Sequence, residues 1–294
     1  MTSIADLLAI HPLPRSEQRL LLQAATGFTL TTLIGFPERH VEDAAVQLFH
    51  ALCTRRLQGE PVAYLTGERE FYGLTFQVDA RLLIPRPETE GLVDWALELG
   101  PRHGPWRVLE LGTGSGALAV TLKHLRPDWH ISATDQSEAM LALARHNAEN
   151  LQAMDIDWFH GHWFDPLQGC APFDLILSNP PYVEPDSPWL LQGDLRFEPR
   201  HALVAARHGM ADLEHLIARA PDFVAPGGHL LLEHGHAQGA ACRQRLAEAG
   251  FEATTTRRDL GGLERLSGGQ WHAELALCDK IREHGRADTS PSSR

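Results

Sequence analysis

The fold is indicated by residues 107–125, RVLELGTGSGALAVTLKHL, where a short apolar run leads through three glycines into a helix-forming segment. We predict a strand at Arg107–Leu111, a helix at Ala117–Leu125 and a tight loop between them. Glycines are needed where a strand turns sharply into a helix and where the backbone must approach a ligand closely. This stretch is therefore expected to begin an α/β sheet.

Strand and helix signals keep alternating downstream, which is typical of a doubly wound, mainly parallel sheet. Further strands are predicted at residues 130–134, 155–159, 173–178, 229–233, 251–257 and 271–277. Helices are predicted at residues 89–99, 137–151, 210–224 and 237–249. Ser137 is expected as an N-cap. The last two strands should form a hairpin with Gly268-Gly269-Gln270 in its turn, which completes a seven-stranded α/β sheet.

The residues before this alternating region predict a different architecture. Apolar residues recur at helical spacing over residues 15–25 and 37–57. Residues 1–68 are therefore predicted to form an N-terminal helical domain. Strand-favouring residues from 71 to 84, with a turn at residues 79–81, predict a β-hairpin linker over residues 69–88. Residues 89–279 would then form the sheet domain, and residues 280–294 a flexible tail.

Composition excludes several classes of protein. The 294 residues include 26 Lys and Arg against 38 Asp and Glu, which gives a net charge of −12. An acidic chain binds nucleic acid or anionic membranes poorly, because it has no basic excess that displaces counterions. The apolar run Ile4–Ile10 is too short for a signal peptide, and no apolar run is long enough to cross a membrane. We expect free thiols in a reducing cytoplasm, because neither a disulfide framework nor metal-ligand spacing is present among Cys53, Cys170, Cys242 and Cys278.

The glycine loop and the following strand predict a nucleoside-binding site. Asp135 ends that strand, where a carboxylate can accept hydrogen bonds from both ribose hydroxyls of an adenosine-containing cofactor. The loop also satisfies the loose dinucleotide fingerprint, because Gly112, Gly114 and Ala117 have its spacing. This segment by itself leaves NAD and S-adenosylmethionine open. The acidic Glu110 suits cationic sulfonium and ammonium groups better than a pyrophosphate.

The tetrapeptide Asn179-Pro180-Pro181-Tyr182 favours S-adenosylmethionine. It follows a predicted strand, at the edge where open α/β sheets bind ligands. The Asn179 amide oxygen and the Pro180 carbonyl can accept the two N–H bonds of a planar NH2 group, and Tyr182 offers an aromatic face. Such a nitrogen is a weak nucleophile because its lone pair is delocalised. Holding it in line with a sulfonium methyl lets it attack without a strong base.

With these residues, the sequence resembles the HemK/PrmC-type protein-glutamine methyltransferases, which act on peptide-chain release factors. Nucleic-acid amino-methyltransferases share the tetrapeptide, whereas residues 84–90 and 196–199 are more specific to the family. The matching segments are Gly67-Glu68-Arg69-Glu70-Phe71, Leu83-Ile84-Pro85-Arg86-Pro87-Glu88-Thr89-Glu90, Glu110-Leu111-Gly112-Thr113-Gly114-Ser115-Gly116, Asn179-Pro180-Pro181-Tyr182, Arg196-Phe197-Glu198-Pro199 and Leu231-Leu232-Glu233-His234-Gly235.

The resemblance implies a class I methyltransferase, Rossmann-like fold that uses S-adenosyl-L-methionine. The cofactor-binding residues that it implies are Gly112, Thr113, Gly114, Ser115, Gly116, Asp135, Trp163 and Asn179. Trp163 would stack on the adenine, or alternatively pack in the core. The substrate glutamine would be bound by Asn179, Pro180, Pro181 and Tyr182, of which Asn179, Pro180 and Tyr182 would be catalytic. Residues 86–89 would line the methionine end of the cofactor, and residues 196–198 would either support the site loop or contact a ligand.

The implied function is methylation of the glutamine side-chain amide in the Gly-Gly-Gln loop of release factors, in translation termination. The enzyme would be cytoplasmic, and its helical domain would grip the protein substrate. Alternatives are a ribosomal-protein glutamine methyltransferase, a nucleic-acid amino-methyltransferase, which would need a basic surface, and a binding protein that uses the fold as a scaffold. No nucleic acid, membrane or metal is expected as a partner. The pairs His160/His162 and His234/His236 are expected to be exposed at strand ends.

Overall fold

The computed structural model describes residues 2–272, so the predicted tail and the part of the last predicted strand after residue 272 lie outside the described residues. The chain forms two compact units. The first, called the helical unit, comprises the residues up to Arg69, Gln77–Ile84 and Pro188–Pro199. The second, called the sheet unit, comprises Glu70–Phe76, Pro85–Ser187 and residues 200–272.

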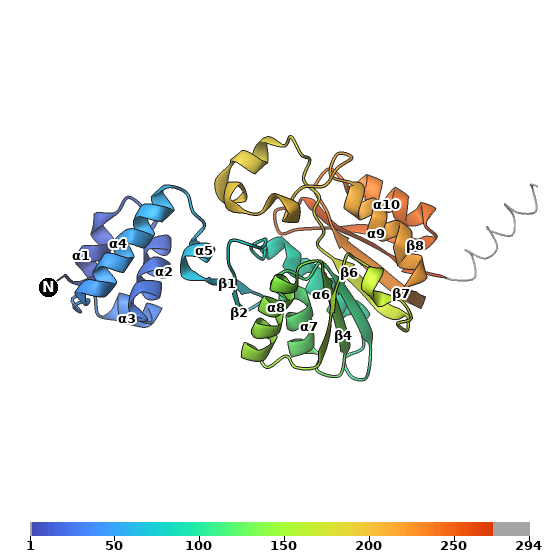
Figure 1. Ribbon diagram of the computed structural model, residues 1–294, viewed down its shortest axis with the longest axis horizontal. Helices are drawn as coiled ribbons and strands as arrows, with labels where there is room; N and C mark the ends of the chain where they lie inside the picture. The colour runs from blue at the N-terminus through green and yellow to red at the C-terminus, as the bar shows by residue number, and fades with distance from the viewer. Residues whose placement is uncertain (1, 273–294) are drawn as a thin grey trace, which may run out of the picture. The chain divides into compact units, whose positions relative to one another are not determined.

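Short helices form most of the helical unit (Figure 1). They are α1 (Ile4–Ile10), α2 (Arg15–Thr26), α3 (Leu30–Gly35), α4 (Asp43–Leu57) and α5 (Val62–Thr66). Their apolar faces meet in a core whose fully buried members include Ile4, Leu7, Leu21, Leu22 and Phe49. The helix predicted at residues 15–25 is confirmed by α2.

The helix predicted at residues 37–57 starts too early, because α4 begins only at Asp43. The backbone N–H groups of Ile4 and Ala5 donate to the carbonyls of Arg39 and Pro37. These N–H groups belong to the first turn of α1, where no intrahelical acceptor exists. The segment before α4 therefore closes the N-terminus of α1 instead of adding a turn to α4.

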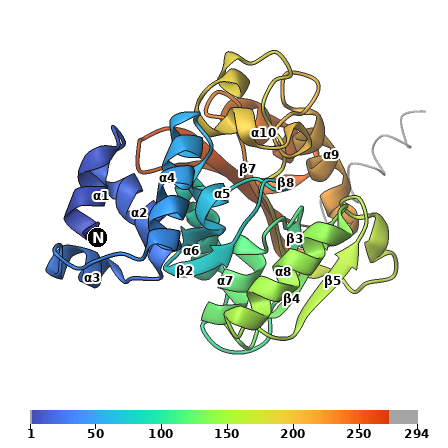
Figure 2. The same cartoon turned by 60° about the vertical axis from the view of Figure 1, so that its left-hand side comes forward.

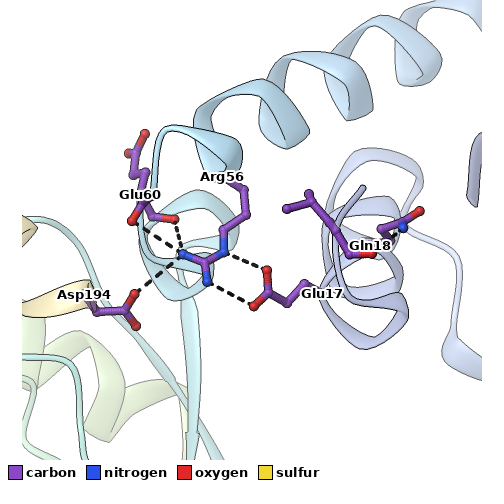
Figure 3. A network of polar contacts seen from close by, with 7 residues as sticks. Glu17, Gln18, Arg56, Glu60 and Asp194 are labelled. Atoms are coloured by element: carbon purple, nitrogen blue, oxygen red, sulfur yellow. Dashed lines mark hydrogen bonds and ion pairs between the residues drawn. The ribbon is translucent and has the colours of Figure 1, made fainter. Parts of the chain in front are cut away.

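Arg56, near the end of α4, joins three parts of the helical unit (Figure 3). Its guanidinium makes a two-pronged ion pair with Glu17 of α2, at 2.7 and 3.0 Å. It also donates to the Glu60 carbonyl at 3.2 Å and lies 3.6 Å from a carboxylate oxygen of Asp194. Nearby, Arg196 donates to the Gln58 carbonyl at 2.6 Å. These contacts hold residues 188–199 against the helices although they are distant in sequence.

The predicted hairpin exists, but its turn is not where the sequence suggested. Strands β1 (Glu68–Phe71) and β2 (Leu74–Gln77) are joined by Tyr72 and Gly73, whose φ angles are 53° and 77°. Two residues with positive φ match the right-handed twist of the flanking strands, as in a type I′ turn. A tyrosine rarely adopts this conformation, which explains why the prediction placed the turn at residues 79–81. There, Asp79 pairs with Arg81 in a separate local turn.

The sheet unit contains the predicted seven-stranded sheet. The strand order is β5-β4-β3-β6-β7-β9-β8, in which β9 is antiparallel to both of its neighbours and the other pairs are parallel. The strands are β3 (Arg107–Leu111), β4 (His130–Asp135), β5 (Ile156–His160), β6 (Phe173–Ser178), β7 (Val224–Glu233), β8 (Phe251–Arg258) and β9 (Glu264–Trp271).

Helices cover both faces of this sheet (Figures 1 and 2). They are α6 (Glu90–Leu99), α7 (Ala117–Leu125), α8 (Glu138–Asn150), α9 (Ala211–Arg219) and α10 (Gly239–Glu248). Val108 of β3 packs with α6 and α7, whereas Leu109 and Leu111 pack with α9 and α10. Successive residues of a strand point to opposite faces, so this strand is buried on both sides. The prediction of a doubly wound sheet is confirmed.

Short 3-10 helices lie between these elements: η1 (Pro87–Thr89), η2 (Asp165–Leu167), η3 (Pro188–Leu191), η4 (Gly193–Phe197), η5 (Arg200–Ala202) and η6 (Ala220–Asp222). The helix predicted at residues 210–224 is too long, because η6 contains Pro221 and β7 already starts at Val224. Ser137 does precede α8, but its side chain makes no capping hydrogen bond.

The last strand was predicted wrongly, because β9 spans Glu264–Trp271 and Gly268-Gly269-Gln270 lie inside it rather than in a turn. The connection from β8 runs through residues 259–263, where Asp259 accepts a hydrogen bond from the Leu263 N–H. A Cβ at Gly268 would lie 2.5 Å from a methyl group of Leu231. Glycine is therefore required here by close packing between strands, and not by a turn.

Candidate active site

The predicted site residues lie at the carboxyl ends of adjacent parallel strands. From β3 the chain continues to β4 and then β5 on one side, and afterwards returns to β6 on the other side of β3. The loop after β3 and the tetrapeptide after β6 therefore flank a topological switch point, which is where open α/β sheets bind ligands. The ends of β4, with Asp135, and of β7, with Glu233, lie at the same edge.

The glycine loop curls over the end of β4. The φ angles of Gly112, Gly114 and Gly116 are 73°, 54° and 83°, a region that favours glycine. A Cβ at Gly112 would lie 2.9 Å from the Trp163 ring, so the indole rests against the loop backbone. The side chains of Thr113 and Ser115 are buried. The two buried side chains help to fix the loop conformation, because they point into the protein.

Glu110 supports this loop from inside the protein. The side chain is buried, and its Oε2 accepts hydrogen bonds from the Thr113 hydroxyl at 2.5 Å and from the Ala119 N–H at 2.9 Å. Burial raises the pKa of Glu110 to about 8, although both hydrogen bonds act in the opposite direction. The carboxyl is therefore mostly protonated at neutral pH unless a cation lies close to it.

Asp135 is anchored by two backbone hydrogen bonds. One carboxylate oxygen accepts from the Gly114 N–H and the other from the Ser137 N–H, both at 2.9 Å. An ionised carboxylate has about four acceptor positions, so each oxygen can still accept one more donor. Burial raises the pKa of Asp135, and the two backbone hydrogen bonds partly oppose this shift. The arrangement leaves a fixed carboxylate directly beside the glycine loop.

The tetrapeptide after β6 is held by a chain of buried hydrogen bonds. The Asn179 side-chain Nδ2 donates to the Thr89 hydroxyl at 3.1 Å, and this hydroxyl donates to Glu233 Oε2 at 2.6 Å. The other oxygen of Glu233 accepts from the Tyr182 hydroxyl at 3.0 Å. Glu233 is 1% exposed, so both of its oxygens are satisfied without solvent. The network fixes the Asn179 amide and the Tyr182 ring in one arrangement.

Acceptor atoms remain available at this loop. The Asn179 Oδ1 is buried and has no hydrogen-bond partner among the described residues. None of these residues donates a hydrogen bond to the carbonyl of the buried Pro180 either. A buried polar atom without a partner costs free energy, on the order of 1–3 kcal/mol. Two free acceptors side by side in sequence therefore suit a ligand with two N–H donors.

The backbone of the tetrapeptide is also fixed. The Tyr182 N–H donates to the Leu203 carbonyl at 3.2 Å, and the Tyr182 carbonyl accepts from the Gln238 side chain at 3.1 Å. Gln238 in turn accepts from the Gly235 N–H at 2.7 Å. Gln238 was not singled out from the sequence, because nothing in the pattern connects it to residues more than fifty positions away.

The sequence also missed the roles of Thr89 and Glu233, although both lie in segments that support the resemblance. A signal for Glu233 was present, because it ends a buried apolar strand just as Asp135 does. Arg196 and Glu198 belong to the helical unit, where Arg196 donates to the Gln58 carbonyl and stacks over Phe197. Glu198 is buried. These contacts attach residues 196–198 to the helical unit.

The histidine pairs differ from the expectation in one respect. His160, His162 and His236 are exposed, but His234 is fully buried between the Ser267 hydroxyl and the Gly235 carbonyl. Burial lowers the pKa of His234, so the imidazole is neutral. Within residues 2–272, no three metal-ligating side chains lie together in a group that would hold a metal ion. None of the helices in this range is long and apolar enough to span a bilayer.

Comparison with solved structures shows the fold. A methyltransferase from Pyrococcus furiosus matches with a TM-score of 0.51 and 18% identity, covering 74% of this chain and 97% of that one. A 16S rRNA methyltransferase from T. thermophilus, in complex with AdoMet and guanosine, matches with a TM-score of 0.50 and 19% identity, covering 70% and 50% of the two chains. The sheet unit therefore has the fold of class I methyltransferases.

Sequence comparison identifies the family. Residues 2–67 match the PrmC N-terminal domain and residues 99–189 match the methyltransferase small domain. The release factor glutamine methyltransferase of Salmonella typhimurium is 45% identical, covering 88% of this chain and 92% of its own length. That of Neisseria gonorrhoeae is 46% identical, covering 92% and 98%. With such identity over nearly the whole length of its relatives, this chain belongs to the family of release factor glutamine methyltransferases.

Proposed function

We propose that this enzyme methylates the side-chain amide nitrogen of the glutamine in the Gly-Gly-Gln loop of peptide-chain release factors. The observation that carries the proposal is the buried Asn179 Oδ1 at the switch point of the sheet, which has no hydrogen-bond partner within residues 2–272 and is followed by the Pro180 carbonyl. A carboxamide has two N–H donors in one plane, which match these two acceptors. The names of the relatives support the same substrate class.

The residues of the sheet edge suit S-adenosyl-L-methionine as the cofactor. The loop Gly112–Gly116 would contact it through the backbone, Asp135 would accept the ribose hydroxyls, and Trp163 would stack on the adenine. Asn179 would border its reactive end. When bound, this cofactor supplies a methyl group on a cationic sulfonium. The mainly protonated Glu110 under the loop can ionise in response to such a cation.

The side chains around the acceptor orient and bind the amide, and its nitrogen loses one proton after the methyl group has been transferred. Asn179 and Pro180 would hold both N–H bonds of the glutamine amide, which aims the nitrogen and limits its motion. Burial and the neighbouring Glu233 raise the pKa of Tyr182 well above its ordinary value, so its hydroxyl stays protonated at neutral pH. Tyr182 therefore contributes its aromatic face and is not a general base. Pro181 keeps the loop rigid between these two contacts.

The helical unit is proposed to bind the body of the release factor. Large apolar side chains on its surface are about half exposed, among them Leu20, Leu30, Ile34 and Phe36. These side chains are available for apolar contacts with a protein partner. The net charge of −12 favours a basic, ribosome-associated protein as the partner, through electrostatic steering. An enzyme with this substrate acts in the cytoplasm.

The direct test offers several substrates to the purified enzyme with isotopically labelled S-adenosylmethionine. Release factors, a ribosomal protein fraction and DNA are incubated separately, and mass spectrometry locates the added methyl group. The expected product is a single methyl on the glutamine of the Gly-Gly-Gln loop. Label found only on ribosomal protein or on nucleic-acid bases would overturn the proposal.

A further inference from the structure

The Thr89 hydroxyl lies between two side chains, Glu233 and Asn179, and has a single hydrogen to donate. It is 2.6 Å from Glu233 Oε2 and 3.1 Å from Asn179 Nδ2. Burial raises the pKa of Glu233, whereas the hydrogen bonds from Thr89 and Tyr182 and the nearby Arg265 oppose this shift. With one hydroxyl at each of its oxygens, Glu233 is placed to accept two hydrogen bonds, which directs the Thr89 hydrogen to Oε2. The lone pairs of Thr89 are then left for Asn179. Only the NH2 end of the Asn179 amide can meet them favourably.

An asparagine amide has two orientations of almost equal shape, and only its hydrogen-bond partners distinguish them. With Nδ2 turned toward Thr89, Oδ1 is the amide atom that has no hydrogen-bond partner among the described residues and stays free to accept one. In the reversed orientation, an N–H group of Asn179 would face the N–H groups of the substrate amide. Two donors cannot bond to each other, so the site would lose one of its two acceptors.

We infer that Thr89 and Glu233 are positioning residues for methyl transfer, which fix the Asn179 amide with its oxygen toward the substrate glutamine. This inference rests on the proposed function for the identity of the substrate, but the orientation itself is a property of the free protein. Glu233 directs the Thr89 hydrogen because it accepts hydrogen bonds from the hydroxyls of Thr89 and Tyr182, one at each oxygen. The charged groups that act on it are the cation of Arg265 and the carboxylate of Glu88.

The first experiment measures the orientation without any substrate. The chain contains only three asparagines, Asn147, Asn150 and Asn179, so selective 15N labelling of asparagine gives three side-chain NH2 groups. The spectrum of Asn179→Ala assigns the group of interest. In the unaltered protein and in Thr89→Ser, a hydrogen of Asn179 Nδ2 should exchange slowly with solvent. In Thr89→Val, which keeps the shape but loses the hydroxyl, this exchange should be about tenfold faster.

Asn147 serves as an internal reference in the same spectra, because its Nδ2 donates to the buried Ser115 carbonyl at 2.9 Å. Its exchange should stay unchanged in Thr89→Val. Equal exchange of Asn179 in Thr89→Val and Thr89→Ser would overturn the inference whether or not the protein methylates a release factor. Failure of the unaltered enzyme to methylate a release factor would instead overturn the proposed function and leave the measured orientation standing.

The second experiment measures kinetics with matched variants. Thr89→Val should lower kcat about tenfold or more, and Thr89→Ser should restore most of it, with the affinity for S-adenosylmethionine unchanged. The control is Thr121→Val, since Thr121 is a fully buried threonine of α7 whose hydroxyl has no partner among the described residues. This control should retain full activity. A loss of cofactor affinity that matches the loss of kcat in Thr89→Val would show instead that Thr89 acts on the cofactor.

A double-mutant cycle separates positioning from general damage. Once Asn179→Ala has removed the amide, adding Thr89→Val should cause no further loss of the residual single-turnover rate. An additional tenfold loss on that background would contradict the inference. Should Thr89→Val fail to fold, as judged by thermal unfolding, Glu233→Gln replaces it in both experiments, because an amide at this position no longer dictates which way the Thr89 hydrogen points.

Discussion

The site at the sheet edge has two halves: the cofactor half, with residues 112–116 and Asp135, and the acceptor half, with residues 179–182. One buried glutamate supports each half, but the hydrogen bonds of the two glutamates reach different distances along the chain. Glu110 gathers its two donors on one oxygen, from residues three and nine positions away. Glu233 uses both oxygens, for Thr89 at 144 positions and Tyr182 at 51 positions away. The glycine loop is therefore supported locally, whereas the tetrapeptide depends on contacts that exist only in the complete fold.

This difference implies that the two halves can be damaged separately. Changes in the cofactor half should weaken binding of S-adenosylmethionine and leave the chemistry intact once the site is saturated. Changes in the acceptor half should lower kcat and leave cofactor affinity intact, because its contacts orient the reacting nitrogen. The following variants test that separation.

The largest effect is expected for Asn179→Ala in the acceptor half. Loss of the Oδ1 acceptor removes one of the two bonds that aim the substrate nitrogen, so kcat should fall about 100-fold or more. Calorimetry should find the affinity for S-adenosylmethionine within about twofold of the original, because a side-chain truncation here leaves the glycine loop untouched. Near-normal turnover would remove Asn179 from the mechanism.

The next effect concerns the cofactor half. Asp135→Ala should weaken binding of S-adenosylmethionine about 10- to 100-fold, because a charged acceptor for two hydroxyl groups is lost. At saturating cofactor, kcat should recover to within a few-fold. Asp135→Asn is the matched comparison, since it keeps the size of the side chain. An unchanged affinity in both variants would exclude the ribose contact.

A smaller effect should appear in the proton balance of cofactor binding. With its pKa raised to about 8, Glu110 is mostly protonated at pH 7 in the free protein. A bound cation favours the carboxylate and lowers this pKa, so binding should release protons and should strengthen as pH rises from 6 toward 8. Calorimetry in two buffers of different ionisation enthalpy measures the release. Glu110→Gln should abolish it, and an identical release in that variant would assign the proton to another group.

The smallest effect is expected for Tyr182→Phe. The ring remains, and Glu233 keeps its bond from Thr89, so kcat should fall about threefold at most. One oxygen of Glu233 loses its donor, and thermal unfolding should show a destabilisation of about 1 kcal/mol. Tyr182→Ala is the informative partner, because it removes the aromatic face as well. A loss in Tyr182→Phe as large as that of Asn179→Ala would mean that the hydroxyl participates in transfer.

The parts predicted from the sequence are those decided by nearby residues. The bounds of β3, α7 and β6 match the prediction residue for residue, because compact apolar runs bounded by glycine or proline leave little choice. The positions of the glycine loop and of Asn179 at adjacent strand ends follow from the same alternation. The function followed from the chemistry of the tetrapeptide together with the family resemblance.

The parts that were predicted wrongly are those decided by distant residues. The β9 strand has glycines because it passes tightly between β7 and β8, which no local pattern reveals. The segment before α4 is used by the N-terminus of α1. The Thr89–Glu233 bond likewise joins residues that only the folded sheet brings together. Local chemistry predicted the acceptor, but not the groups that orient it.

The course of residues 188–199 affects how this protein forms during synthesis. These residues belong to the helical unit, yet they follow β6 in the chain. The ion pair between Arg56 and Asp194 and the bond from Arg196 to Gln58 cannot form until the ribosome has made most of the catalytic sheet. The amino-terminal helices are therefore synthesised well before residues 188–199, and a nascent chain stalled before residue 188 would lack these two contacts.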